Sequence, residues 1–215
     1  SISDWAFFGC KSLTKINISD LSSWCKINME SLFSPPANSS NGSLYINGDL
    51  VSDLIIPDGV TEIKSDVFNS FSNISKVTIP SSVKKIGTRT FADCSNLNTV
   101  NLSEGLEKIE YGAFINCSKL EEIRIPKSVT SIGERAFYIS FRNKTKPCLY
   151  VYENSSGYKY AVDNSYSYTL IQNKNIIGVS LENATYTYDG TEKSLAVTGT
   201  LPEGAKVKYT NEKAT

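Results

Sequence analysis

Two neighbouring carboxylates, Glu121 and Glu122, with Arg124 close by, form the arrangement in this sequence that most resembles a catalytic group. A pair of carboxylates can supply the acid and the base of glycoside hydrolysis. In a strand, however, the side chains of adjacent residues point to opposite faces, so these two would meet only if the chain bends them together. We therefore interpret them as part of a solvated surface and not as a catalytic pair.

Nucleophilic and metal chemistry have few candidates. The chain contains no histidine, which is the commonest general base and zinc ligand. Its five cysteines are too scattered to form a CxxC metal site, and their odd number leaves at least one without a partner in this chain. These are Cys10, Cys25, Cys94, Cys117 and Cys148. We expect no enzymatic activity, no cofactor and no metal.

The composition is that of a folded, electrically balanced chain. Of 215 residues, 40% are hydrophobic, and 22 basic residues balance 22 acidic ones. No net field therefore draws the protein to nucleic acid or to an anionic membrane. No apolar stretch reaches the roughly 18 residues of a membrane span, and no signal peptide opens the chain. Because the sequence also lacks a starting methionine, we expect a piece of a longer, processed polypeptide.

A repeat of 23 residues organises most of the sequence. Four columns of apolar residues keep this spacing. The columns are Phe68, Phe91, Phe114 and Phe137; Ile63, Ile86, Ile109 and Ile132; Val60, Val83, Leu106 and Val129; and Ile56, Ile79, Leu102 and Ile125. A unit this short cannot bury its own apolar side, so the units must stack as a solenoid.

Each unit contains the pattern L-x-x-L-x-L, as in Ile74, Val77 and Ile79. Its last positions alternate as in a strand, and about six such strands would form a parallel, concave sheet roughly 24 Å across. The V-x-x-I-G segment predicts a second short extended piece, and the phenylalanines should stack as an internal spine. Cys94 and Cys117 share a column in adjacent units, so they are either a disulfide or, as we favour, two buried thiols.

Two regions depart from the repeat. An expanded unit at about residues 19–56 contains Asn47-Gly48, a strong signal for a hairpin between Leu44–Ile46 and the segment that follows. At about residues 143–172 the pattern decays into a tyrosine-rich stretch, Tyr158 to Tyr168, which either caps the solenoid or offers an aromatic platform for sugars. We favour the cap, and assign residues 1–172 to the solenoid.

Residues 173–215 have short alternating segments separated by turn residues, which predict a second, incomplete β domain. The predicted fold class is therefore α/β, mostly β: a leucine-rich-repeat solenoid with a parallel concave sheet, followed by a partial β-sandwich.

The succession V-x-x-I-G, A-F and C-S-x-L-x-x-I-x-I-P, present from Val83 to Leu102 and from Leu106 to Pro126, resembles the BspA-like leucine-rich repeats of bacterial surface proteins. The tail YDGTEKSLAVTGTLPEGAKVKY resembles the start of an MBG-type bacterial immunoglobulin-like module. The resemblance implies an exported, extracellular or cell-surface protein with a role in adhesion to host matrix proteins or glycans. It carries over no binding residues, because the matching positions belong to the core.

The exposed positions of the L-x-x-L-x-L strands should share one polar face. The candidate partner-binding residues are Thr14, Lys15, Asn17, Ser75, Lys76, Thr78, Asn98, Thr99, Asn101, Glu121, Glu122 and Arg124, and Ser52, Asp53 and Ile55 occupy the same positions in the expanded unit. Two functions remain open: a non-enzymatic surface module that binds a protein or glycan through this face, and a passive spacer that presents other domains.

Overall fold

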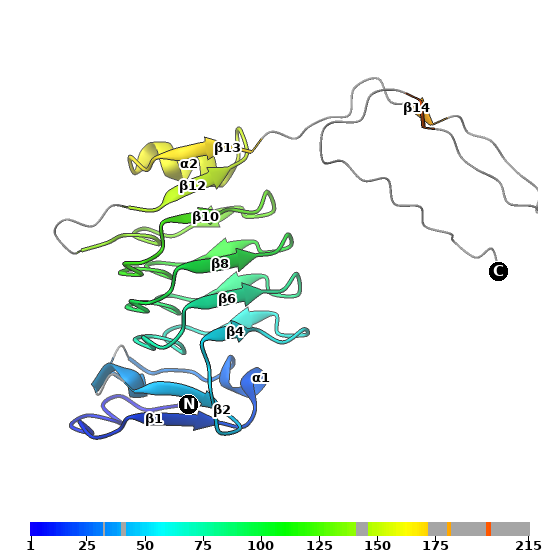
Figure 1. Ribbon diagram of the computed structural model, residues 1–215. Helices are drawn as coiled ribbons and strands as arrows, with labels where there is room; N and C mark the ends of the chain where they lie inside the picture. Colours follow the sequence, from blue (N-terminus) through cyan, green and yellow to red (C-terminus); the bar gives the residue numbers. More distant parts are fainter. Residues whose placement is uncertain (32, 40–41, 141–145, 172–179, 182–196, 199–215) are drawn as a thin grey trace, which may run out of the picture. The chain divides into compact units, whose positions relative to one another are not determined.

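A computed structural model describes residues 1–171, except 32, 40–41 and 141–145, together with residues 180–181 and 197–198. The chain divides into two compact units, Ser1–Ile171 and Gln172–Thr215. In the first unit, successive coils of chain stack on one another as a solenoid (Figure 1). None of the described helices is long and apolar enough to cross a membrane.

One side of the solenoid is formed by strands that run parallel, and we call the surface of their outward side chains the strand face. In chain order these strands are β1 (Lys15–Ile18), β2 (Ser43–Ile46), β4 (Asp53–Ile55), β6 (Lys76–Ile79), β8 (Thr99–Leu102), β10 (Glu122–Arg124), β12 (Cys148–Val151) and β13 (Tyr168–Leu170). Their register follows the repeat, since Lys76 pairs with Thr99 and Ile79 with Leu102. The predicted parallel strands are confirmed.

The strands do not form the single continuous sheet that the repeat predicts. They form three sheets, ordered β1-β2-β3, β4-β6-β8 and β10-β12-β13. The first interruption has a local cause, because β3 (Asp49–Leu50) folds back antiparallel on β2 and takes up the edge that β4 would otherwise use. The second interruption lies between β8 and β10, which form no ladder although they belong to consecutive coils.

A second sheet on another side of each coil remains continuous across that interruption. Its strands are β5 (Glu62–Ile63), β7 (Lys85–Ile86), β9 (Lys108–Ile109) and β11 (Ser131–Ile132), all parallel. They confirm the short extended piece predicted from V-x-x-I-G. Gly87 ends one of these segments where the coils approach closely: a Cβ there would lie 2.6 Å from the backbone nitrogen of Ser65.

The phenylalanine spine is present and fully buried. The rings of Phe68, Phe91, Phe114 and Phe137 stack at centroid distances of 5.3, 5.4 and 5.7 Å. Tyr160 closes the stack edge-on at 5.9 Å. The spine therefore holds four consecutive coils one ring spacing apart, including the two coils whose strands β8 and β10 do not pair.

The expanded unit contains the predicted hairpin. Asn47 and Gly48 have φ values of 51° and 96°, as both central residues of a type I′ turn require. The same unit contains helix α1 (Leu21–Trp24), capped by the Asp20 carboxylate, and a 3-10 turn, η1 (Pro36–Ser39). Trp24 is buried and donates its indole N–H to the Val67 carbonyl at 2.9 Å, which ties this unit to the next coil.

The other end of the solenoid is closed by helix α2 (Ser156–Asp163) and strand β13. Tyr160 and Tyr166 are buried, and their rings lie 5.5 Å apart, as expected of a cap. Tyr168 remains 41% exposed. Tyr160 and Tyr166 thus cover the end of the apolar core as predicted, while Tyr168 faces solvent.

In residues 172–215 the structure describes a single antiparallel pair, β14 (Ser180–Leu181) with β15 (Val197–Thr198). The rest of the predicted immunoglobulin-like segment lies outside the described residues.

Candidate functional site

The outward side chains of the strand face form two columns. Asp53, Lys76, Thr99, Glu122 and Cys148 make the first, and Ile55, Thr78, Asn101, Arg124 and Tyr150 make the second. These positions alternate with the buried core residues of the same strands. The structure thus brings together Lys76, Thr78, Thr99, Asn101, Glu122 and Arg124, as the sequence predicts, and places Ser75, Asn98 and Glu121 just before the strands.

Three of the predicted residues, Thr14, Lys15 and Asn17, belong to a different part of this side. Lys15 and Asn17 lie on β1, in the first of the three sheets, and Thr14 precedes that strand. The side-chain oxygen of Asn17 accepts the N–H of Gly48 at 2.9 Å, and the Lys15 ammonium lies 4.3 Å from the centre of the Tyr45 ring. Both side chains therefore stabilise the hairpin unit locally.

The polar groups of β4 and β6 also pair with one another. The Lys76 ammonium contacts the Asp53 carboxylate at 2.8 Å, and the Ser75 hydroxyl donates to the Ser52 carbonyl at 3.1 Å. Each member of the ion pair is about two-fifths exposed, so the pair contributes little to stability. This part of the strand face carries these paired polar groups and one exposed apolar side chain, Ile55.

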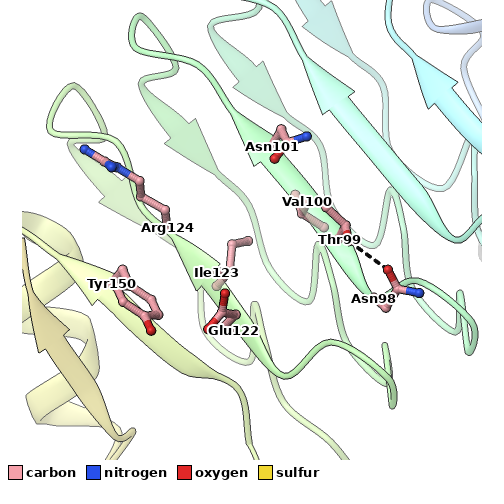
Figure 2. Close-up of a pocket in the computed structure, with 8 residues that line it drawn as sticks. All are labelled: Asn98, Thr99, Val100, Asn101, Glu122, Ile123, Arg124 and Tyr150. Carbon is pink, nitrogen blue, oxygen red and sulfur yellow. Dashed lines mark hydrogen bonds between the residues drawn. The ribbon is translucent and has the colours of Figure 1, made fainter. Parts of the chain in front are cut away.

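The interruption between β8 and β10 opens a cleft in the strand face, which we call the strand-break cleft (Figure 2). Its volume is about 280 Å³. Its lining residues are Asn98, Thr99, Val100, Asn101, Glu122, Ile123, Arg124 and Tyr150. Five of the twelve predicted partner-binding residues, Asn98, Thr99, Asn101, Glu122 and Arg124, thus meet around one depression.

The cleft reaches down to the apolar core. Val100 is 7% exposed, whereas Leu54 and Val77, its counterparts on β4 and β6, are fully buried. Val100 and the buried Ile123 thus line the base of the cleft, between its polar walls.

The walls of the cleft carry the positive charge of Arg124, the negative charge of Glu122 and the hydroxyl group of Tyr150. The Arg124 guanidinium donates to the Tyr152 hydroxyl at 2.7 Å and lies over the same ring. The neighbouring Glu122 carboxylate raises the pKa of the Tyr150 hydroxyl, because its negative charge disfavours ionisation of the phenol. Figure 2 shows Glu122, Arg124 and Tyr150 on neighbouring strands along this depression.

The carboxylates of Glu121 and Glu122 are both exposed, and Glu121 lies in a second depression with Asn98, Ser118, Lys119 and Glu122. Within the described part of the chain, no group of three or more Cys, Asp or Glu side chains could hold a metal ion. The geometry offers hydrogen-bond donors and acceptors to a partner.

The cysteines are free thiols, which confirms the favoured interpretation of Cys94 and Cys117. Both are fully buried and donate to the carbonyls of Phe68 and Phe91, at 3.1 and 3.2 Å. Burial raises the pKa of the Cys94 thiol to about 12 and that of Cys117 well above its usual range. These thiols are structural and unreactive.

Sequence reasoning missed Tyr150 as part of the face and did not anticipate the cleft itself. Leu149 and Val151 are buried on either side of Tyr150, and this alternation is the signal that places β12 in the same series of strands. The interruption of the ladder leaves no such trace, because Val100 and Ile123 both fit the apolar pattern.

Comparisons with known proteins agree with this architecture. A family model described as the BspA type leucine rich repeat region matches residues 1–41 and 45–144 in six copies. No curated protein matches the chain.

Among solved structures, a leucine-rich repeat protein from Bacteroides ovatus is 24% identical, with a TM-score of 0.51 over 80% of this chain and 40% of its own. A leucine rich cell surface protein from Faecalibacterium prausnitzii is 21% identical, with a TM-score of 0.50 over 69% of this chain and 44% of its own. At these identities the likeness shows the fold. The chain spans less than half the length of either structure.

Proposed function

Because this chain belongs to the BspA-type leucine-rich-repeat family, we propose that it is a non-enzymatic binding module of a cell-surface protein, and that its strand face contacts a protein or glycan ligand. The printed description of the Faecalibacterium prausnitzii structure as a cell surface protein supports an extracellular or surface location. We also propose that residues 1–172 are the binding solenoid and that residues 173–215 begin an immunoglobulin-like module.

The observation that carries this proposal is the strand-break cleft. Elsewhere on the strand face, polar groups pair with their neighbours, as Lys76 does with Asp53. At the cleft, polar side chains surround an apolar floor in a depression, and ligand sites combine these two properties. The predicted residues on β8 and β10 therefore outrank those on β1 as partner contacts.

Binding by the immobilised chain of residues 1–215 to host matrix proteins and to a glycan array tests the proposal. A variant with Lys76, Asn101, Glu122 and Arg124 all changed to Ala should fold normally, since exposed side chains typically change stability by within about 0.5 kcal/mol each. We expect the native chain to bind at least one ligand class and the variant to lose that binding.

A matched control changes four exposed charged residues off the strand face, Glu107, Lys108, Lys127 and Glu134, to Ala. This control should bind as the native chain does. Equal binding by the native chain and the strand-face variant would reject the strand face as the site. Absence of any binding would favour a passive spacer that presents other domains.

A further inference from the structure

The carbonyl of Asn98 lacks the backbone partners that its counterparts have. The Ser52 carbonyl accepts the N–H groups of Ser75 and Lys76, at 2.9 and 3.1 Å. The Ser75 carbonyl accepts those of Asn98 and Thr99, at 2.9 and 3.3 Å. The Asn98 carbonyl accepts no backbone N–H among the described residues. The Asn98 carbonyl, just before β8, where no ladder joins that strand to β10, thus needs water or a ligand as its partner.

The side chains around the cleft offer both donors and acceptors. The Asn101 amide is exposed and makes no hydrogen bond within the described residues, so its oxygen and its N–H groups are available. Arg124 uses one guanidinium nitrogen on Tyr152 and keeps further donors. Glu122 adds a carboxylate. One positive and one negative group line the same cleft, which favours a ligand without net charge.

The cleft also has apolar surface for the non-polar side of a ligand. Val100 and Ile123 form its floor, and the half-buried Tyr150 ring lines it. Its volume of about 280 Å³ lies close to the lower end of small-ligand pockets, which begin at roughly 300 Å³. A single sugar residue offers both kinds of group: hydroxyl groups that can hydrogen-bond to the polar walls, and C–H groups that can pack on the apolar floor.

An extended peptide fits this cleft poorly. A strand inserted between β8 and β10 would need two strand spacings, about 9.6 Å, between them. The same two coils are held together by the stacked rings of Phe114 and Phe137, 5.7 Å apart, and by the paired strands β9 and β11. Insertion of a strand would have to separate this spine.

We propose that the strand-break cleft is a saccharide subsite that takes one uncharged sugar residue. This inference rests on the binding role of the strand face proposed above. Sugar hydroxyls take the place of the missing ladder partners, with Asn101, Glu122 and Arg124 as the side-chain contacts.

Nuclear magnetic resonance of the isotope-labelled chain of residues 1–215 tests this inference. The probes are the methyl glycosides of glucose, galactose, mannose, N-acetylglucosamine and glucuronic acid. At least one neutral glycoside should shift the amide signals of Val100, Leu102 and Glu122 saturably, with a weaker response to the charged glucuronide. Asn101→Ala and Glu122→Gln should each raise the dissociation constant about tenfold or more, since the first removes a hydrogen bond to the ligand and the second replaces a charge-assisted hydrogen bond with a weaker, neutral one. Lys127→Ala, at an exposed residue off the strand face, should leave it unchanged.

Failure of every glycoside to shift these signals would overturn the saccharide subsite, as would shifts that persist unchanged in Asn101→Ala and Glu122→Gln. Neither result would by itself remove the binding function. A chain that binds a matrix protein through the strand face, and loses that binding in the four-residue variant, would retain the proposed function and lose this inference.

Discussion

The side-chain amide of Asn73 takes the place of a neighbouring strand for Leu44. Its oxygen accepts the Leu44 N–H at 3.0 Å, and its nitrogen donates to the carbonyls of Leu44 and Val51, at 3.2 and 2.5 Å. At the first interruption of the strand series, a side chain from the next coil therefore makes the hydrogen bonds that a neighbouring strand would otherwise make. The second interruption, at Asn98, has no such substitute among the described residues, and this difference separates a structural junction from a candidate binding cleft.

Changing Asn73 to Ala should destabilise the solenoid, because the N–H of the buried Leu44 would lose its acceptor and the carbonyl of the buried Val51 would lose its donor. Leaving such groups unpaired costs about 1–3 kcal/mol. Urea unfolding, followed by circular dichroism, measures the loss.

Asn96→Ala is the matched control, because Asn96 lies one repeat further along and donates a single hydrogen bond, to the Ser72 carbonyl. It should cost clearly less than Asn73→Ala. Equal losses would mean that the junction at Leu44 does not depend on the Asn73 amide.

Truncation of the spine should be the most damaging single change. Phe114 is fully buried and stacks against a ring on each side, so Phe114→Ala leaves a cavity within the stack. We expect a loss of about 3–5 kcal/mol in the free energy of unfolding, measured by urea denaturation. Phe8→Ala, at a ring that is 71% exposed, should change the same quantity by less than about 0.5 kcal/mol. A Phe114→Ala loss as small as that of Phe8→Ala would contradict a role for the spine.

Gly133 should not tolerate even a methyl group. A Cβ at this position would lie 2.4 Å from the backbone nitrogen of Tyr111 in the preceding coil. Gly133→Ala must therefore push the two coils apart, at a cost of about 1–3 kcal/mol in thermal or chemical unfolding. Glu110, one repeat earlier in the same column, already carries a Cβ, so Glu110→Ala is the control and should cost much less. A neutral Gly133→Ala would show that the coils are not in close contact there.

The buried thiols should make stability fall at high pH. Burial raises the pKa values of Cys25 and Cys94 to about 12, so these thiols stay protonated in the folded chain while their unfolded counterparts ionise near pH 9. Their contribution to the free energy of unfolding is complete below about pH 8.5, where the thiols are protonated in both states, and is lost as the pH rises toward 12. At pH 10, each fully buried thiol should cost about 1.5 kcal/mol relative to pH 8.

Comparison of the native chain with Cys94→Ala at pH 8 and pH 10 isolates this effect from the lysines and tyrosines that titrate in the same range. The variant should lose less unfolding free energy over this interval. Cys10→Ala, at an exposed cysteine, should follow the native chain. Identical pH dependence in the native chain and Cys94→Ala would rule out the buried thiol as the cause.

The repeating core could be predicted because each coil places the same residue type at the same point. The regular spacing of Phe68, Phe91 and Phe114 in the sequence predicts that their rings stack in successive coils. The dipeptide Asn47-Gly48 predicts a type I′ turn from its two residue types alone. Such features depend on residues a fixed distance apart in the chain.

The interruptions of the ladder could not be predicted in this way. Whether β8 pairs with β10 depends on how two whole coils pack against each other. Val100 and Ile123 match the apolar pattern of strands that do pair, so the sequence does not reveal the interruption. The role of Asn73 is equally hidden, because an amide at that position looks like any other polar residue between apolar ones. The candidate residues on β8 and β10 were found from periodicity, but the cleft that gathers them was not.

The missing ladder between β8 and β10 also has a mechanical consequence. A surface binding module, the function proposed above, carries tension when its bound ligand is pulled, and a stack of coils yields first where the fewest bonds resist separation. At this junction the load falls on the β9–β11 pair, on backbone hydrogen bonds between residues 112–116 and 134–138, and on the contact between Phe114 and Phe137. The junction between β6 and β8 has a complete strand-face ladder in addition. Stretching of the solenoid should therefore begin at one of the two interruptions of the strand face, and at the second of these, pulling force and occupancy of the cleft act on the same pair of strands.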